Sequence, residues 1–248
     1  MSEQVVLITG ALTGIGRATA IAFAREGAKV VVSGRHDKEG HKLVIELRHL
    51  GAEAEFVRTD VRHEGDIQKL VDCAISRFGR LDVAVNNAGT EGNPGPFTVQ
   101  TAETYAATFD TNVLGTLLSM KHELRVMLPQ SHGSIINVSS TYGRSGASGA
   151  ALYVGSKHAV EGFTKAASIE FAETGVRINV VAPGPIETGM LNRFTGTAEK
   201  KANSISAVPM RRIGQPKEVA AAILFLASDK ASFITGVSLA IDGGKLAR

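Results

Sequence analysis

The stretch Val-Val-Leu-Ile-Thr-Gly-Ala-Leu-Thr-Gly-Ile-Gly, residues 5–16, decides the fold of this chain. Four apolar residues of strand length lead directly into a glycine-rich turn, and a segment with helical periodicity follows at once. Glycine allows a sharp turn and close approach of the backbone to a pyrophosphate, which then lies at the positive end of the helix dipole. A turn without a ligand is the alternative, but the strand–turn–helix context favours a dinucleotide-binding loop. Its binding residues are predicted to be Gly10, Thr13, Gly14, Ile15 and Gly16.

Apolar runs of strand length alternate with helical segments along the rest of the chain, which is the pattern of βαβ units. The interior strands are rich in Val and Ile without alternation, as expected when helices cover both faces of a sheet. We therefore predict an α/β fold with a doubly wound, parallel, seven-stranded sheet. Strands are expected at 5–9, 29–33, 54–59, 81–86, 133–139, 177–181 and 238–241, and helices at 15–26, 38–50, 64–79, 101–128, 152–173 and 216–228. No repeat or linker divides the chain, so residues 1–248 should form a single domain.

One segment departs from this pattern. Residues 191–208 are polar and poorly periodic, and loops of this length are uncommon in compact domains unless they have a function. We expect a substrate lid at 189–213, with a plain surface insertion as the alternative.

The composition of the chain argues against several classes of partner and ligand. No apolar run approaches the roughly 18–20 residues of a membrane span, and the basic residues are scattered, so neither a membrane nor a nucleic acid is expected as a partner. The lone Cys73 has no partner for an intrachain disulfide, and the seven histidines show no metal-ligand spacing, so no metal is expected. Because the first strand begins near Gln4, there is no room for a leader peptide, and we expect a cytoplasmic protein.

Tyr153 and Lys157 form the sequence Tyr-Val-Gly-Ser-Lys and would lie one turn apart on the same face of a helix. An ammonium within about 4–6 Å favours a phenolate and so lowers the phenol pKa from about 10. A surface pair on an amphipathic helix is the alternative. Together with the glycine loop, the pair indicates hydride chemistry in which the phenol donates a proton.

The end of the second predicted strand reads Ser33-Gly34-Arg35-His36. An acidic residue at this position would hold the ribose 2′-hydroxyl of NAD, whereas a guanidinium can hold the 2′-phosphate of NADP. NADP(H) is therefore the expected cofactor, with Gly34 and Arg35 at its 2′-phosphate. If Arg35 points into water, NAD(H) remains usable.

These motifs resemble those of the short-chain dehydrogenase/reductase family, in its members of about 250 residues, and the resemblance covers essentially the whole chain. Residues 9–16 resemble the family's glycine loop, and Asn86-Asn87-Ala88-Gly89 matches another of its motifs. Ser140 precedes Tyr153 by the family's catalytic spacing, with Lys157 following. The resemblance implies a Rossmann-like fold and an oxidoreductase.

The resemblance also implies roles for four residues. Tyr153 would be the acid in carbonyl reduction and the base in alcohol oxidation, and Lys157 would lower its pKa and hold the nicotinamide ribose. Ser140 would bond the substrate oxygen. Asn112 matches the asparagine that holds a water for proton relay, although by itself it is only a mildly unfavourable helix residue.

Cofactor contacts follow by the same resemblance. Asp60 and Val61 would lie against adenine. The ribose would contact Asn87, Ala88 and Gly89, and the nicotinamide would lie along Pro183, Gly184, Ile186 and Thr188. Many NADP-using relatives carry a basic residue where this chain has Thr13. The ending Asp242-Gly243-Gly244 resembles that of members that are commonly homotetramers.

The expected activity is hydride transfer between NADP(H) and a carbonyl or secondary alcohol, with a small-molecule substrate. The substrate is predicted to contact Ser140, Tyr142, Tyr153, Pro185 and Leu191, and further candidates for an apolar wall are Gly143, Leu152, Met190 and Phe194, some of which would only pack against the lid. An NAD-preferring alcohol, sugar or polyol dehydrogenase is the alternative. A sugar-nucleotide epimerase or dehydratase usually needs a larger substrate domain. A non-catalytic dinucleotide-binding regulator would have no need for the tyrosine.

Overall fold

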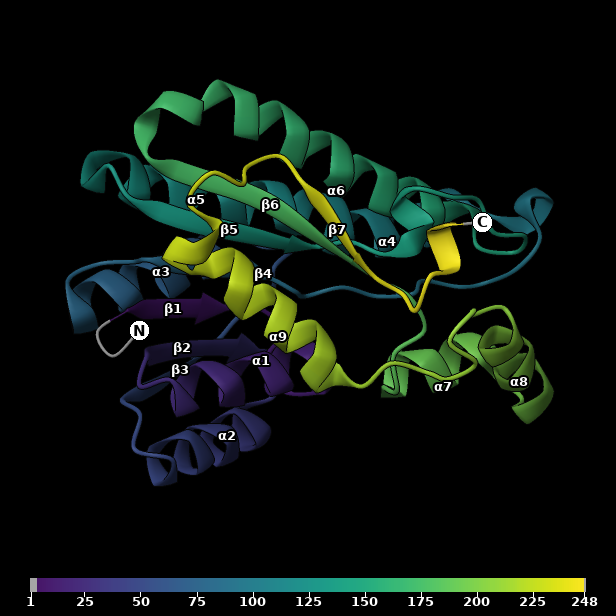
Figure 1. Ribbon diagram of the computed structural model, residues 1–248, viewed down its shortest axis with the longest axis horizontal. Helices are drawn as coiled ribbons and strands as arrows, with labels where there is room; N and C mark the ends of the chain where they lie inside the picture. The colour runs from purple at the N-terminus through teal and green to yellow at the C-terminus, as the bar shows by residue number, and fades with distance from the viewer. Residues whose placement is uncertain (1–3, 248) are drawn as a thin grey trace.

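A computed structural model describes residues 4–247 and contains a seven-stranded sheet in which every pair of neighbours is parallel. The strand order is β3-β2-β1-β4-β5-β6-β7. The strands are β1 (Val5–Ile8), β2 (Lys29–Gly34), β3 (Ala54–Arg58), β4 (Val83–Asn86), β5 (Gly133–Val138), β6 (Val176–Pro183) and β7 (Ser238–Ile241). The predicted doubly wound sheet is confirmed, and each predicted strand is present with boundaries shifted by a few residues (Figure 1).

Helices cover both faces of this sheet. The six predicted helical regions contain α1 (Gly14–Arg25), α2 (Asp37–His49), α3 (Glu64–Phe78), α4 (Ala102–Phe109), α5 (Gly115–Gln130), α6 (Ala151–Glu170) and α9 (Pro216–Ala227). The single helix expected over 101–128 is divided, because a π-helical turn at Asp110–Leu114 separates α4 from α5. Such turns concentrate at functional sites.

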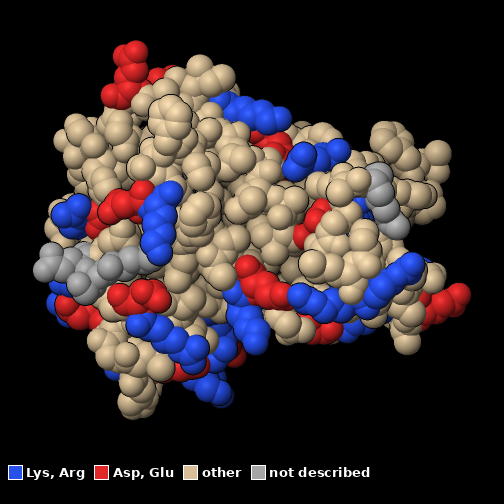
Figure 2. All heavy atoms as spheres, in the orientation of Figure 1, with Lys and Arg blue, Asp and Glu red and all other residues tan. Residues whose placement is uncertain are grey.

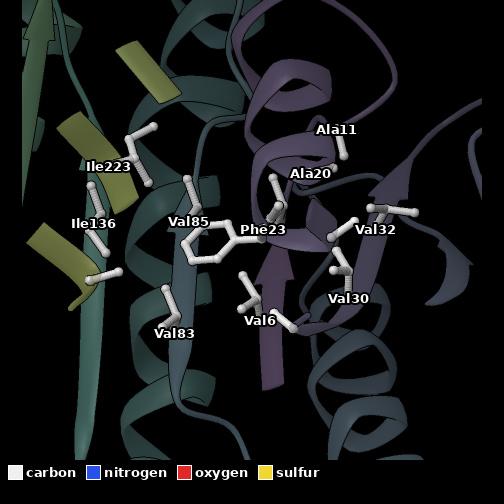
Figure 3. Packing of buried hydrophobic residues seen from close by; sticks show 14 of the residues in the cluster. Val6, Ala11, Ala20, Phe23, Val30, Val32, Val83, Val85, Ile136 and Ile223 are labelled. Carbon is white, nitrogen blue, oxygen red and sulfur yellow. The ribbon is translucent and has the colours of Figure 1, made fainter. Parts of the chain in front are cut away.

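Alternating strand residues build the two apolar layers. Figure 3 shows Phe23 of α1 beside Val6, Val83 and Val85, all fully buried. This layer is completed by side chains of α2 and α9. On the other face, Leu7 packs with residues of α3, α5 and α6. Because both faces are buried, most strand positions are apolar, and buried polar exceptions such as Asn86 and Asn137 are hydrogen-bonded to each other.

The segment expected as an irregular lid is mostly helical, and that expectation of its structure was wrong. It contains α7 (Gly189–Thr195) and α8 (Ala198–Ser206), which extend beyond the sheet near the C-terminal end of the chain (Figure 1). Each begins at a threonine whose hydroxyl accepts a bond from a backbone amide, Thr188 for α7 and Thr197 for α8. Helices this short show little periodicity in sequence, and their capping residues stabilise them locally.

The surface carries interspersed basic and acidic side chains on the face drawn in Figure 2. Within the described part of the chain, no helix is both long and apolar enough to cross a bilayer. Residues 4–247 also contain no group of three or more His, Cys, Asp or Glu side chains placed to hold a metal ion.

Candidate active site

A cleft of about 710 Å³ opens where the strand order reverses, with β1 between β2 and β4. Open α/β sheets bind dinucleotides at such a point, outside the carboxyl ends of the strands. The cleft is lined by most of the residues predicted to hold the cofactor: Gly10, Thr13, Gly14, Ile15, Gly34, Arg35, Asp60, Val61, Asn87, Ala88, Gly89 and Thr188. The fold therefore gathers five separate sequence segments into one nucleotide-sized cleft.

The first and third loop glycines are required by close packing. Gly10 has a φ of +63°, and a Cβ there would lie 2.8 Å from the Cα of Ala88. Gly16 does not line the cleft, and a Cβ on it would lie 2.5 Å from Nδ2 of Asn87. Gly16 therefore serves the packing of α1 against the segment after β4, while Gly10 allows the sharp turn.

Asn87 fixes the shape of the loop. Its Nδ2 donates to the carbonyl oxygens of Thr9 and Gly10 at 3.0 and 2.9 Å. In return, Oγ1 of Thr9 accepts from the backbone amides of Asn87 and Ala88, both at 3.1 Å. These bonds join the two motifs into one preorganised floor of the cleft.

Arg35 lies exposed at the rim of the cleft. Neighbouring arginines are paired, Arg58 with Asp37 and Arg62 with Asp60, whereas among residues 4–247 no carboxylate forms an ion pair with Arg35. The hydrogen bond from Arg62 is the main cause that lowers the pKa of Asp60 to about 2. Asp60 thus stays ionised and engaged by Arg62, and the guanidinium of Arg35 is available for an anion.

A second cavity of about 390 Å³ adjoins the cleft. Both are lined by Ile15, Asn87, Gly89, Glu91, Thr188 and Met190. The second cavity is lined by Ser140, Tyr153 and Lys157, and also by Pro183, Gly184 and Ile186, the residues expected along the nicotinamide. A molecule lying along the cleft would therefore end next to Tyr153.

Tyr153 and Lys157 lie one turn apart at the start of α6, as predicted. The Nζ atom of Lys157 is 5.7 Å from the centre of the Tyr153 ring, and it donates to the carbonyl oxygen of Val138 at 2.9 Å. The strand end of β5 therefore holds the ammonium in place beside the phenol.

Burial is the largest cause of the pKa shifts of both Tyr153 and Lys157. It raises the pKa of Tyr153 to about 12, and a hydrogen bond with Ser140 offsets only part of this rise. Burial likewise lowers the pKa of Lys157 to about 8. The predicted lowering of the tyrosine pKa by Lys157 is therefore wrong for the protein on its own, because desolvation of the phenolate raises the pKa and the effect that opposes it is the hydrogen bond with Ser140. The phenol stays protonated at neutral pH, the form that a proton donor needs.

Asn112 lies in the π-helical turn and is fully enclosed rather than exposed in either cavity. Its Nδ2 donates to the carbonyl oxygen of Thr90 at 2.9 Å and to Oγ of Ser156 at 3.0 Å, and its Oδ1 accepts from the Thr90 amide at 2.8 Å. A Cβ placed on Gly89 would lie 3.3 Å from Oδ1 of Asn112 and 3.6 Å from Nζ of Lys157. Asn112 therefore supports the backbone beside the lysine.

The expected substrate residues meet in the second cavity. Ser140, Tyr142, Tyr153, Pro185 and Leu191 all line it, and so do Met190 and Phe194. Gly143 and Leu152, two of the wall candidates, do not. A Cβ on Gly143 would lie 2.4 Å from Oγ of Ser139, so Gly143 belongs to the packing behind the wall.

Three lining residues with charged side chains were missed by sequence reasoning. Glu91, shortly after the Asn-Asn-Ala-Gly motif, forms a two-point ion pair with Arg193 of α7, at 2.5 and 3.2 Å. Its place two residues after Gly89 of that motif could have indicated that it lies at the site. Lys245 directly follows Asp242-Gly243-Gly244, and Arg193 follows Thr188 by five residues, but neither belongs to a motif, and only the fold brings them to the site.

Comparisons with known proteins agree with this geometry. A family model described as Enoyl-(Acyl carrier protein) reductase matches residues 10–245. A cyclohexanol dehydrogenase from Acinetobacter sp. (strain SE19) is 38% identical, with 98% of this chain and 94% of the relative covered. The crystal structure of levodione reductase has a TM-score of 0.97 at 32% identity, covering 100% of this chain and 99% of the other. The structure of ElxO with NADP bound has a TM-score of 0.93 at 37% identity, covering 99% and 100%. The chain thus belongs to the short-chain dehydrogenase/reductase family of oxidoreductases.

Proposed function

We propose that this protein transfers a hydride between NADP(H) and a carbonyl or secondary alcohol group of a small molecule. The observation that carries the proposal is the position of Tyr153 and Ser140 in an apolar cavity that shares its lining with the dinucleotide cleft. The NADP in one solved neighbour and the cyclohexanol in one relative's name support it.

Three features of the cleft suit a dinucleotide: its glycine turn, its volume, and the guanidinium of Arg35, which forms no ion pair within residues 4–247. The pyrophosphate would rest on the loop at Gly10, Gly14 and Ile15, and Arg35 would hold the 2′-phosphate. Asp60 and Val61 would contact adenine, and Pro183, Gly184, Ile186 and Thr188 would lie along the nicotinamide. The bound cofactor supplies or accepts the hydride; NAD(H) remains the second candidate.

The protein's own groups would orient the substrate and move the proton. Ser140 would bond the substrate oxygen and align it with Tyr153. The phenol would donate its proton as that oxygen gains charge in reduction, and its anion would accept a proton in oxidation. Lys157, held by Val138, would bond the nicotinamide ribose and stabilise the ionised tyrosine. Asn112 would hold a water for proton relay, while its side chain fixes the backbone of Thr90.

We further propose that residues 189–213 act as the substrate lid. α7 supplies Met190, Leu191 and Phe194 to the cavity wall, while the Glu91–Arg193 ion pair ties α7 to the segment after β4. Closure of these apolar side chains over the substrate would exclude water from the reacting centre.

A homotetramer and a cytoplasmic location complete the proposal. Exposed apolar side chains on α4, α5 and α6, among them Tyr105, Leu117 and Ile169, are of the kind that subunit contacts cover. Light scattering coupled to gel filtration tests the tetramer, and fractionation of producing cells tests the location.

The activity itself is tested with a panel of ketones and secondary alcohols, scored by nicotinamide absorbance with NADP(H) and NAD(H) in turn. We expect turnover of at least one neutral ketone with NADPH, and faster turnover than with NADH. Tight dinucleotide binding without turnover of any member would favour a non-catalytic binding protein instead.

A further inference from the structure

The C-terminal turn contributes one residue to the lining of the catalytic cavity. Lys245 begins the short turn Lys245–Ala247 and lines the same cavity as Tyr153. Its backbone is fixed, because the carboxylate of Asp242 accepts from the amides of Gly244 and Leu246 at 2.9 and 2.8 Å. Figure 1 shows this C-terminal turn on the side of the sheet where α7 and α8 lie.

The charge of Lys245 is not matched by an acidic side chain. Its Nζ lies 4.1 Å from the centre of the Tyr142 ring and 3.4 Å from Oγ1 of Thr141. Among residues 4–247 no carboxylate forms an ion pair with it, whereas Glu91, the acidic residue of the cavity lining, is neutralised by Arg193. Besides the ammonium of Lys157, which donates to Val138, the largely apolar cavity therefore presents a second ammonium that no carboxylate of residues 4–247 pairs with.

This ammonium lies within reach of a small substrate held at Tyr153. The Tyr142 and Tyr153 rings are 6.4 Å apart by their centres, and Nζ of Lys245 is 4.1 Å from the first ring centre. The distance from Nζ of Lys245 to the centre of the Tyr153 ring is therefore no more than the sum of these two distances. A substrate with one six-membered carbon ring, and a carboxylate on the carbon opposite its carbonyl, is long enough to reach from Tyr153 toward Lys245.

We propose that Lys245 binds a carboxylate of the substrate, so that the enzyme acts on cyclic oxo acids or the matching hydroxy acids. This rests on the proposed function at Tyr153. An apolar wall would hold the ring, Ser140 and Tyr153 the reacting oxygen, and Lys245 the anionic group at the opposite end. The carboxylate takes no part in the reaction, since hydride and proton both go to the carbonyl group.

The test compares 4-oxocyclohexanecarboxylate with its carboxamide, which has nearly the same shape but no charge. Lys245→Met keeps the length of the side chain and removes the ammonium, and Lys245→Arg retains a cation. We expect Lys245→Met to raise KM for the carboxylate roughly tenfold or more, the cost of one lost hydrogen bond to a charged group, with little change for the carboxamide. Lys245→Arg should restore most of the preference.

Lys69→Met on the exposed face of α3 is the matched control, because Lys69 lies outside the cavity lining and outside the proposed lid. Equal KM changes for both probes in Lys245→Met, or a wild-type preference for the carboxamide, would overturn the proposal. If no ketone is turned over at all, the proposed function fails separately. Calorimetric binding of the carboxylate to wild type and Lys245→Met, in the presence of NADPH, then decides the role of Lys245 alone: equal affinities overturn it, and weaker binding by the variant supports it.

Discussion

Lys157 holds its ammonium against the carbonyl oxygen of Val138, 2.9 Å away, while the centre of the Tyr153 ring lies 5.7 Å from the same nitrogen. The lysine is thus anchored to β5 by a bond that does not involve the tyrosine. Its buried position also lowers its pKa to about 8, so its charge depends on the groups around it. This geometry fits the proposed role of Lys157, which would stabilise an ionised Tyr153 without donating the proton itself.

Lys157→Ala should therefore harm both cofactor binding and rate. The substitution removes the ammonium proposed to bond the nicotinamide ribose and leaves the carbonyl oxygen of Val138 without its partner. We expect the Kd for NADPH to rise and kcat to fall. Fluorescence titration and steady-state kinetics measure the two effects, and an unchanged nucleotide affinity would show that Lys157 does not contact the ribose.

Arg35→Ala should weaken NADPH binding much more than NADH binding. Loss of a charge-assisted contact to phosphate costs about 1.5–3 kcal/mol, which is roughly tenfold to hundredfold in Kd. Arg25→Ala, on the exposed end of α1 away from the cleft, serves as the control. Parallel losses for both nucleotides in Arg35→Ala would remove the 2′-phosphate role.

The Glu91–Arg193 ion pair should hold the proposed lid closed. The Glu91 side chain is only 9% exposed, so the pair is less screened than a surface one, and about 1 kcal/mol of coupling is expected. Arg193→Met should then speed release of NADPH about fivefold in stopped-flow measurements. A double-mutant cycle with Glu91→Gln isolates the pair, and additive effects of the two substitutions would show that they are not coupled across the cleft.

Glu123 of α5 should make folding stability depend on pH. Its carboxyl is fully buried, one oxygen accepts from Nδ2 of Asn86 at 3.0 Å, and burial raises its pKa to about 8. Because the unfolded pKa is about 4.3, its contribution is fully present below that pH and is lost as pH rises toward 8, by at most about 1.4 kcal/mol per pH unit. Urea unfolding at pH 6 and 8 measures the loss.

Glu123→Gln mimics the protonated carboxyl and should lose less stability than wild type between these pH values. The exposed Glu199→Gln on α8 is the control, which should follow wild type. If Glu123→Gln keeps the full pH dependence of the wild type, the carboxyl of Glu123 is not the group responsible.

Sequence patterns predicted the sheet and the strand, glycine turn and helix at the cleft, since these depend on local features. The apolar run before Gly10 and the glycines after it specify strand, turn and helix within a dozen residues. The π-helical turn around Asn112 was not predicted, because nothing in its local sequence distinguishes it from a continuous helix. Its bonds to Thr90 and Ser156 exist only once α4, α6 and the loop after β4 have packed together.

The charged residues of the site depend on tertiary structure in the same way. Arg193 reaches Glu91 because the short helix α7 folds back over the cleft, and Lys245 reaches the cavity because the C-terminal tail follows β7 to the same end of the sheet. The pKa shift of Tyr153 was predicted in the wrong direction for the protein without its cofactor. Sequence reveals the neighbouring ammonium, whereas the desolvation that raises the pKa of Tyr153 is a property of the packed fold.

The central claim is that the Tyr153 hydroxyl transfers the proton, and Tyr153→Phe tests it most directly. The ring remains in place and only the hydroxyl is lost, so NADPH affinity should stay within about twofold of wild type while kcat/KM for the best ketone falls by about 10²–10⁴. Tyr105→Phe, on the exposed face of α4, should leave both unchanged. A Tyr153→Phe enzyme that binds NADPH normally and reduces the ketone at the wild-type rate would contradict the account.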